Sequence, residues 1–217
     1  MHTLTASERQ ILETIQQQSM LDQVLSWSAV NSGSGNLNGL AETANMLAEA
    51  FSVLPGEITL IDPEPVDRVL TDGSIKTVAH GQHLLVTVRA DAPTQLLFTG
   101  HMDTVFPADH EFQNWHWLED GALNGPGVAD MKGGISVMLA ALRAAELSGS
   151  LARTGYQILI NSDEEVGSPS SAKLIEKLAQ NKLAALTYEP ALPDGTLAGA
   201  RGGSGNFSVI FSGLSAH

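Results

Sequence analysis

Short apolar runs alternate along the chain with stretches of helical periodicity, and this alternation constrains the fold more than any other feature. The apolar runs lie at 58–61, 84–88, 95–99, 156–160 and 184–188. Helical patterns lie at 40–54, 133–147 and 168–178, after a first apolar stripe formed by Ile11, Leu12, Ile15, Leu21, Val24 and Leu25. Strands separated by helices of this length indicate βαβ units. We therefore predict an α/β fold with a mostly parallel central sheet flanked by helices.

Polar side chains follow three of the predicted strands, and one further polar side chain, that of Asp130, lies just before the predicted helix at 133–147. This set contains one histidine and six acidic residues, namely His101, Asp103, Asp130, Asp163, Glu164, Glu165 and Glu189. Because the carboxyl ends of parallel strands share one edge of a sheet, we expect these residues to converge there. Taken singly, His101 and Asp103 also fit a local hydrogen bond, and the acidic run 163–165 also fits a solvated loop. Their common sheet edge favours a site.

An imidazole with several carboxylates and no thiolate is a ligand set suited to zinc or a similar divalent ion. A carboxylate can bridge two ions, and two-metal sites clamp the attacking and leaving oxygens of a hydrolysis. His101 and Asp103 are two residues apart, so both side chains can share one face and Asp103 can orient the imidazole. Glu164 and Glu165 are adjacent and point in different directions. One of them could bind metal while the other acts as a general base.

Composition and missing motifs exclude several other classes of protein. Asp and Glu outnumber Lys and Arg 24 to 11, and the formal net charge of -13 disfavours a nucleic-acid partner. The chain has no cysteine, so thiolate sites are excluded. The sequence signatures of P-loops, of nucleophilic serine in G-x-S-x-G and of H-E-x-x-H zinc sites are absent. No signal peptide and no apolar run of about 18 residues is visible, so we expect a cytoplasmic protein without a membrane partner.

Four segments together resemble the motifs of the di-zinc exopeptidase and deacylase family, and they occur in the family's order. They are GHMDTVFP at 100–107, GPGVADMKGG at 125–134, DEEVGS at 163–168 and YEP at 188–190. The family includes glutamate carboxypeptidase, acetylornithine deacetylase and succinyl-diaminopimelate desuccinylase. The first motif and the stretch 201–217 look most similar to the glutamate carboxypeptidase branch.

The resemblance implies two zinc ions, for which cobalt or manganese could substitute. It implies that His101, Asp130 and Glu189 bind one ion, and that Asp130 bridges to a second ion bound by Glu165. It also implies that Glu164 is the general base for metal-bound water, that Asp103 supports His101, and that the peptide bond after Asp130 is cis. The activity so implied is carboxypeptidase-like hydrolysis of peptide or N-acyl amide bonds, with an N-acyl amino acid deacylase as the alternative.

The resemblance also implies a domain organisation. Residues 1–203 would form the N-terminal part of a catalytic zinc-binding domain. Residues 204–217 would begin an inserted α+β dimerisation domain, with its first strand at about 205–211. In the family, a histidine at the position of His217 reaches into the partner subunit of a homodimer and helps to stabilise the oxyanion.

The second zinc of the family has a further histidine ligand beyond the inserted domain, so we expect little activity from these 217 residues alone. An inactive remnant that binds metal or a partner is therefore an alternative from another class of protein. Retention of Glu164 argues against that alternative, because a pure metal binder needs no free base. The branch resemblance favours small substrates with a free carboxylate, but Lys132 and Arg201 are the only basic residues near the motifs.

Overall fold

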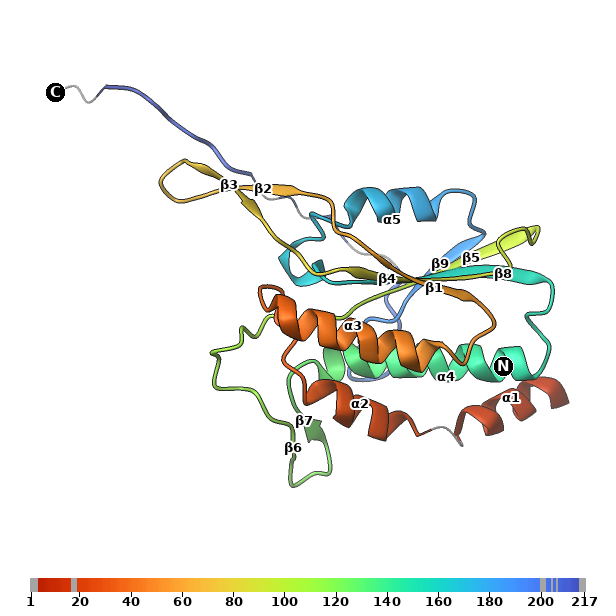
Figure 1. The fold of residues 1–217 in the computed structure, drawn as a ribbon. Coiled ribbons are helices and arrows are strands. Elements are labelled where there is room, and N and C mark those ends of the chain that lie inside the picture. The colour runs from red at the N-terminus through yellow and green to blue at the C-terminus, as the bar shows by residue number, and fades with distance from the viewer. Residues whose placement is uncertain (1–3, 17–18, 200–201, 204, 206, 215–217) are drawn as a thin grey trace.

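A five-stranded mixed sheet forms the centre of the protein in a computed structural model that describes residues 4–16, 19–199, 202–203, 205 and 207–214 (Figure 1). The strand order is β1 (Glu57–Ile61), β4 (His83–Val88), β8 (Thr154–Asn161), β5 (Thr94–His101) and β9 (Ala184–Thr187). The pairs β8–β5 and β5–β9 are parallel, whereas β1–β4 and β4–β8 are antiparallel. All five strands of this sheet had been predicted.

The prediction of a mostly parallel sheet is wrong for its β1–β4 side, and the connections explain why. Parallel neighbours need a crossover of a dozen or more residues, usually a helix. No helix separates β1 from β4; the chain between them instead forms the hairpin of β2 (Val66–Val69) and β3 (Ile75–Val78). Only residues 89–93 join β4 to β5, so the chain must reverse its direction there.

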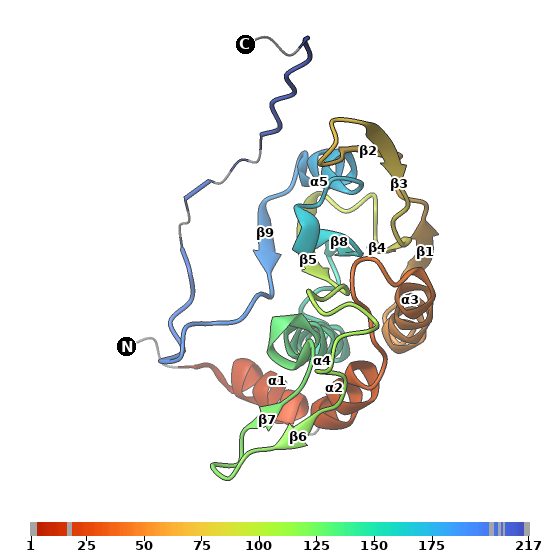
Figure 2. The same cartoon turned by 90° about the vertical axis from the view of Figure 1, so that its left-hand side faces the viewer.

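Helices cover both faces of the sheet. Figure 1 shows α3 (Leu37–Phe51) and α4 (Gly134–Leu147) against one face and α5 (Ala172–Ala179) against the other. In Figure 2, α1 (Ala6–Gln16) and α2 (Met20–Ser28) lie outside α4, in a further layer. The main core lies between the sheet and α3 and α4, and includes Leu47, Phe51, Val86, Met138, Ile158 and Ile160. A smaller cluster of Leu97, Leu159 and Leu178 packs under α5.

Two helices begin or end differently from the prediction, each for a local reason. The first apolar stripe is divided between α1 and α2, because Ile15 and Leu21 are six positions apart and cannot share one helical face. Thr5 caps α1: its hydroxyl accepts from the Glu8 backbone N–H, and the Glu8 carboxylate accepts from the Thr5 backbone N–H. The last helix begins only at Ala172, because the residues before it bind a buried carboxylate described below.

Two further segments lie outside the central sheet and its helices: a short hairpin that was not predicted and an irregular stretch near the end of the chain. The short strands β6 (His116–Trp117) and β7 (Leu123–Asn124) form a second hairpin. Residues 207–214 run away from the sheet (Figure 2) and form no strand, so their assignment to an inserted domain remains a prediction. Within the described ranges, no helix is both long and apolar enough to cross a membrane.

Candidate metal centre

The parallel part of the sheet brings the predicted site residues together at the carboxyl ends of its strands. His101 is the last residue of β5, and the short turn η2 (Glu164–Val166) follows β8. Glu189 follows β9, the other parallel neighbour of β5. Asp130 lies in the irregular turn η1 (Val128–Gly133) that leads into α4. Four separate segments therefore supply one cluster of side chains.

His101 is held so that its Nε2 atom faces the acidic residues. The ring is 1% exposed, and its Nδ1–H donates to the backbone carbonyl of Asp103 at 3.0 Å. The Asp103 carboxylate lies on the same side of the ring, with Oδ1 3.4 Å from Nδ1. A carbonyl or carboxylate on one ring nitrogen leaves the other free to bind a metal. The backbone carbonyl of Asp103 and its carboxylate, rather than the carboxylate alone, thus orient the imidazole.

The buried Asp103 carboxylate also fixes the backbone of the two adjacent glutamates. It accepts hydrogen bonds from the backbone N–H groups of Glu164 and Glu165 at 3.1 and 3.2 Å, and from the Ser34 hydroxyl at 2.7 Å. Ser34 was not predicted as part of the site, because its turn is far from residue 103 in sequence. The two segments meet through a bridge between Gly33 and Thr104. Asp103 is therefore a positioning residue for both His101 and the glutamate pair.

Four carboxylates surround the Nε2 atom of His101. Asp130 Oδ1 is 2.9 Å away, Glu189 Oε1 3.5 Å and Glu164 Oε2 4.0 Å. Two sets of ligand atoms lie within 4.8 Å of one another, one from His101, Asp130 and Glu165 and the other from His101, Glu164 and Glu189. The structure thus brings together all the residues predicted to bind metal, as well as the predicted base. The peptide bond between Asp130 and Met131 is cis, as the resemblance implies.

The electrostatics of the cluster fit a cation. Burial, together with the charges of Asp130, Asp103 and Glu164, raises the pKa of Glu165 to about 7 against the opposing effect of His101. Burial likewise raises the pKa of Glu189. Burial alone would lower the pKa of His101, but the hydrogen bond and charge of Asp103 and the nearby glutamates raise it to about 9. Oxygen and imidazole donors with this excess of negative charge fit one or two divalent ions.

A close approach between α4 and the chain after β9 places Glu189 beside Asp130. A Cβ atom on Gly134 would lie 1.9 Å from the carbonyl oxygen of Tyr188, so only glycine fits at this position. Gly127 adopts a left-handed conformation with φ of 70°, which any other residue disfavours, and begins the turn that carries Asp130. These two glycines of the second motif therefore have structural roles that position two acidic residues.

Asp163 lies beneath the site and does not point into it. Its buried carboxylate accepts hydrogen bonds from the backbone N–H and hydroxyl of Ser170 at 2.6 and 2.8 Å, and from the Ser171 hydroxyl at 2.6 Å. The Asn161 amide donates at 3.1 Å. Burial raises the pKa of Asp163, but these hydrogen bonds outweigh burial and lower the pKa below its ordinary value. Asp163 therefore anchors the loop between β8 and α5.

We expect Asp163→Asn to lower the free energy of unfolding by about 2–4 kcal/mol at pH 7, because buried donors lose a charged acceptor. A lowered folded-state pKa contributes stability that is present above the unfolded pKa and is lost as pH falls. The difference between wild type and variant should therefore shrink below about pH 4. Urea unfolding at pH 7 and below about pH 4 measures this difference in the free energy of unfolding, with the exposed Asp91→Asn as control. A difference that does not change with pH would contradict the prediction.

Lys132 is not available to a substrate. The side chain is 1% exposed, and its Nζ donates to the carbonyl oxygens of Trp27 and Val30 at 3.0 and 3.2 Å. Burial lowers its pKa to about 8. Lys132 thus caps the C-terminal end of α2, and the sequence did not predict this role. Arg201 and His217, the other two residues singled out near the end of the chain, lie outside the described residues.

Comparison with known proteins agrees with this geometry. Residues 97–202 match the model of peptidase family M20/M25/M40. The chain is 28% identical over 161 residues to carboxypeptidase G2 of Pseudomonas sp. (strain RS-16), which covers 74% of this chain and 36% of that protein. It is 37% identical over 101 residues to succinyl-diaminopimelate desuccinylase 2 of Shewanella loihica, which covers 43% of this chain and 26% of that protein. The chain thus spans about a third of the length of these relatives.

Solved structures share the fold at low sequence identity. Human carnosine dipeptidase 1 has a TM-score of 0.67 at 19% identity, with 85% of this chain and 41% of that chain covered. The M20 family metallo-carboxypeptidase Sso-CP2 from Sulfolobus solfataricus has a TM-score of 0.62 at 21% identity, covering 82% and 39%. The matching motifs, the sheet and the cluster of His101 with acidic residues agree with this match, and over residues 97–202 the chain is identified with the M20 peptidase family.

Proposed function

We propose that the chain forms the metal-binding part of a zinc-dependent hydrolase of peptide or N-acyl amide bonds. The observation that carries the proposal is the convergence of four carboxylates on the Nε2 atom of one buried histidine. Two of the similar proteins are named as a carboxypeptidase and a desuccinylase, which supports amide hydrolysis of either kind. A homodimer and a cytoplasmic location belong to the same proposal.

The proposed ligand roles follow from the positions of the carboxylates. His101, Asp130 and Glu189 would hold one ion, because their atoms are the nearest to Nε2, at 2.9 and 3.5 Å. Asp130 would bridge to a second ion held by Glu165, because ligand atoms of both residues lie within 4.8 Å of each other and of His101. When bound, two such ions would polarise the amide carbonyl and lower the pKa of a nearby water.

Glu164 would act as the general base. Its side chain is 48% exposed and lies 4.0 Å from Nε2, so it can reach a water at the centre, while Asp103 fixes its backbone. Glu164 would remove a proton as the water oxygen attacks the amide carbon. It would then return that proton to the amine nitrogen as the carbon–nitrogen bond breaks. Water and amide thus yield a carboxylic acid and an amine, with no other reactant.

A substrate panel tests this function and separates its alternatives. The zinc-loaded complete protein, rather than these 217 residues alone, would be assayed with peptides that have a free C-terminal residue and with N-acetyl amino acids. A carboxypeptidase releases the C-terminal residue of the peptides, whereas a deacylase prefers the N-acetyl series. Activity in either series should disappear with a chelator and return with zinc. Stoichiometric metal without hydrolysis in either series would contradict the proposal and favour a metal-binding or partner-binding protein.

A further inference from the structure

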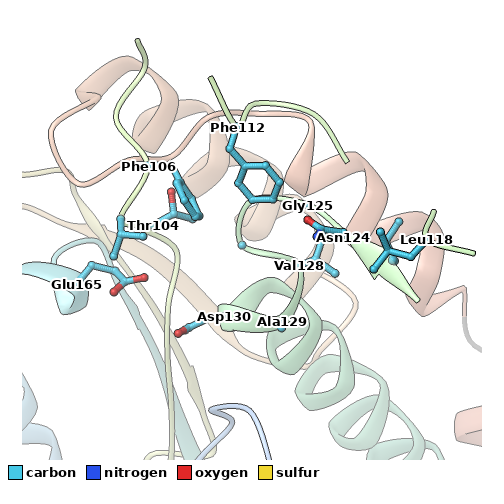
Figure 3. A pocket seen from close by; sticks show the side chains of 13 residues that line it. Thr104, Phe106, Phe112, Leu118, Asn124, Gly125, Val128, Ala129, Asp130 and Glu165 are labelled. Carbon is cyan, nitrogen blue, oxygen red and sulfur yellow. The ribbon is translucent and has the colours of Figure 1, made fainter. Parts of the chain in front are cut away.

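A cavity of about 560 Å³ opens beside the acidic cluster, within the size range of small-molecule sites. Asp130 and Glu165 line one end, as Figure 3 shows, and Leu118 lies at the opposite end. The rings of Phe106 and Phe112 lie between these ends. The cavity is therefore continuous with the site where the amide would react.

Away from its acidic end, the wall of this cavity is mostly apolar, and its described residues bring no positive charge. Seven of its lining side chains are aliphatic or aromatic, namely Val105, Phe106, Phe112, Leu118, Leu123, Val128 and Ala129. Among the residues that the structure describes, no lysine or arginine lines the cavity, and the nearby Lys132 is buried against carbonyl oxygens. A carboxylate placed here would lose its hydration next to two acidic residues. An uncharged group is therefore favoured over an anionic one.

Packing holds the wall in place. The Phe106 and Phe112 rings meet edge to face with centroids 5.0 Å apart. Trp115 packs on the backbone of Gly125, where a Cβ atom would lie 2.5 Å from the tryptophan Cβ. A preformed apolar pocket binds without a large ordering cost.

The positions of the acidic residues indicate which side of the amide enters the cavity. Of the acidic residues around His101, Asp130 and Glu165 line the cavity, whereas Glu164 and Glu189 do not. Glu164 must reach the leaving nitrogen to return its proton. The amine side of the substrate therefore lies toward Glu164, and the acyl side extends toward the cavity.

We propose that the cavity binds an apolar, phenyl-sized acyl substituent, so that the preferred substrates are amides of arylacetic or similar uncharged acids. The inference rests on the proposed function and specifies its substrate class. It places Phe106, Phe112 and Leu118 as specificity-determining residues.

Binding of three hydroxamates to the zinc-loaded protein tests this inference, because the hydroxamate group anchors each compound at metal. Calorimetry should show phenylacetohydroxamate binding at least about tenfold more tightly than acetohydroxamate. The reason is that the apolar surface of the phenyl group is transferred from water into the cavity. Succinic monohydroxamate should bind more weakly than the phenyl compound. Equal binding of the three, or a preference for the succinyl compound, would overturn the inference while leaving the metal site intact.

Three variants locate the effect in the cavity. Phe112→Ala should reduce the preference for the phenyl compound, whereas Phe211→Ala, which changes a 91% exposed phenylalanine outside the cavity, should not. Leu118→Arg should raise the affinity for the succinyl compound about tenfold, because it adds a cation at the far end. An unchanged order of affinities in both cavity variants would contradict the assignment even if Phe112→Ala is partly unfolded.

A metal-free measurement separates this inference from the proposed function. Phenylacetamide, but not acetamide, should shift the ring resonances of Phe106 and Phe112 in the chelated protein. If the shifts appear but no hydroxamate binds, the cavity assignment holds and the zinc function fails. If phenylacetamide leaves both rings unchanged, the cavity assignment fails.

Discussion

Glu164→Gln is expected to lower kcat by at least about 100-fold while the protein keeps its zinc and its fold. Glutamine has the size of glutamate but cannot accept the proton of the attacking water. The backbone N–H of residue 164 still donates to Asp103, so the turn should stay in place. The measurement is kcat with the best substrate of the panel, together with zinc content.

The matched control is Glu176→Gln, which changes an exposed glutamate on α5 and should leave kcat unchanged. Loss of zinc in Glu164→Gln would show that this residue is a ligand rather than a base. Hydrolysis at a near-normal rate would show that Glu164 has no part in proton transfer.

Asp130→Ala is expected to remove most of the bound zinc. Asp130 is the carboxylate nearest to Nε2 of His101 and also lies with Glu165, so its loss takes one ligand from each proposed ion. Loss of a ligand weakens metal binding strongly, because the remaining donors are fewer and less well placed. Zinc per chain would be measured by mass spectrometry after purification without chelator.

The control for this variant is Asp109→Ala, an exposed aspartate outside the cluster, which should keep the wild-type zinc content. Unchanged zinc in Asp130→Ala would contradict the proposed ligand set. Circular dichroism of both variants separates loss of metal from loss of fold.

The sequence predicted the parallel half of the sheet and the meeting of its acidic residues for one physical reason. Parallel strands end at the same edge, so residues that follow β5, β8 and β9 must lie close together. The same reasoning was wrong for β1 and β4, where no helix separates the strands and the chain reverses. Short connections, rather than strand composition, decided that part of the topology.

Other features depend on contacts that leave no periodic signal. Ser34 reaches Asp103 from 69 positions away in sequence, and nothing in its turn-rich segment indicates that partner. Lys132 is one of two basic residues near the motifs in sequence, but its side chain is buried against the end of α2. The cavity is lined largely by irregular chain at 104–130, where hydrophobic periodicity predicts neither helix nor strand. Side-chain packing between distant segments determines these features.

The most direct test of the account is the position of metal in crystals of the zinc-loaded protein, located by anomalous scattering at the zinc edge. We predict a peak about 2.0–2.2 Å from Nε2 of His101 and from oxygens of Asp130 and Glu189, with any second peak beside Glu165. A peak elsewhere, or none at His101 in a protein that binds zinc stoichiometrically, would contradict it.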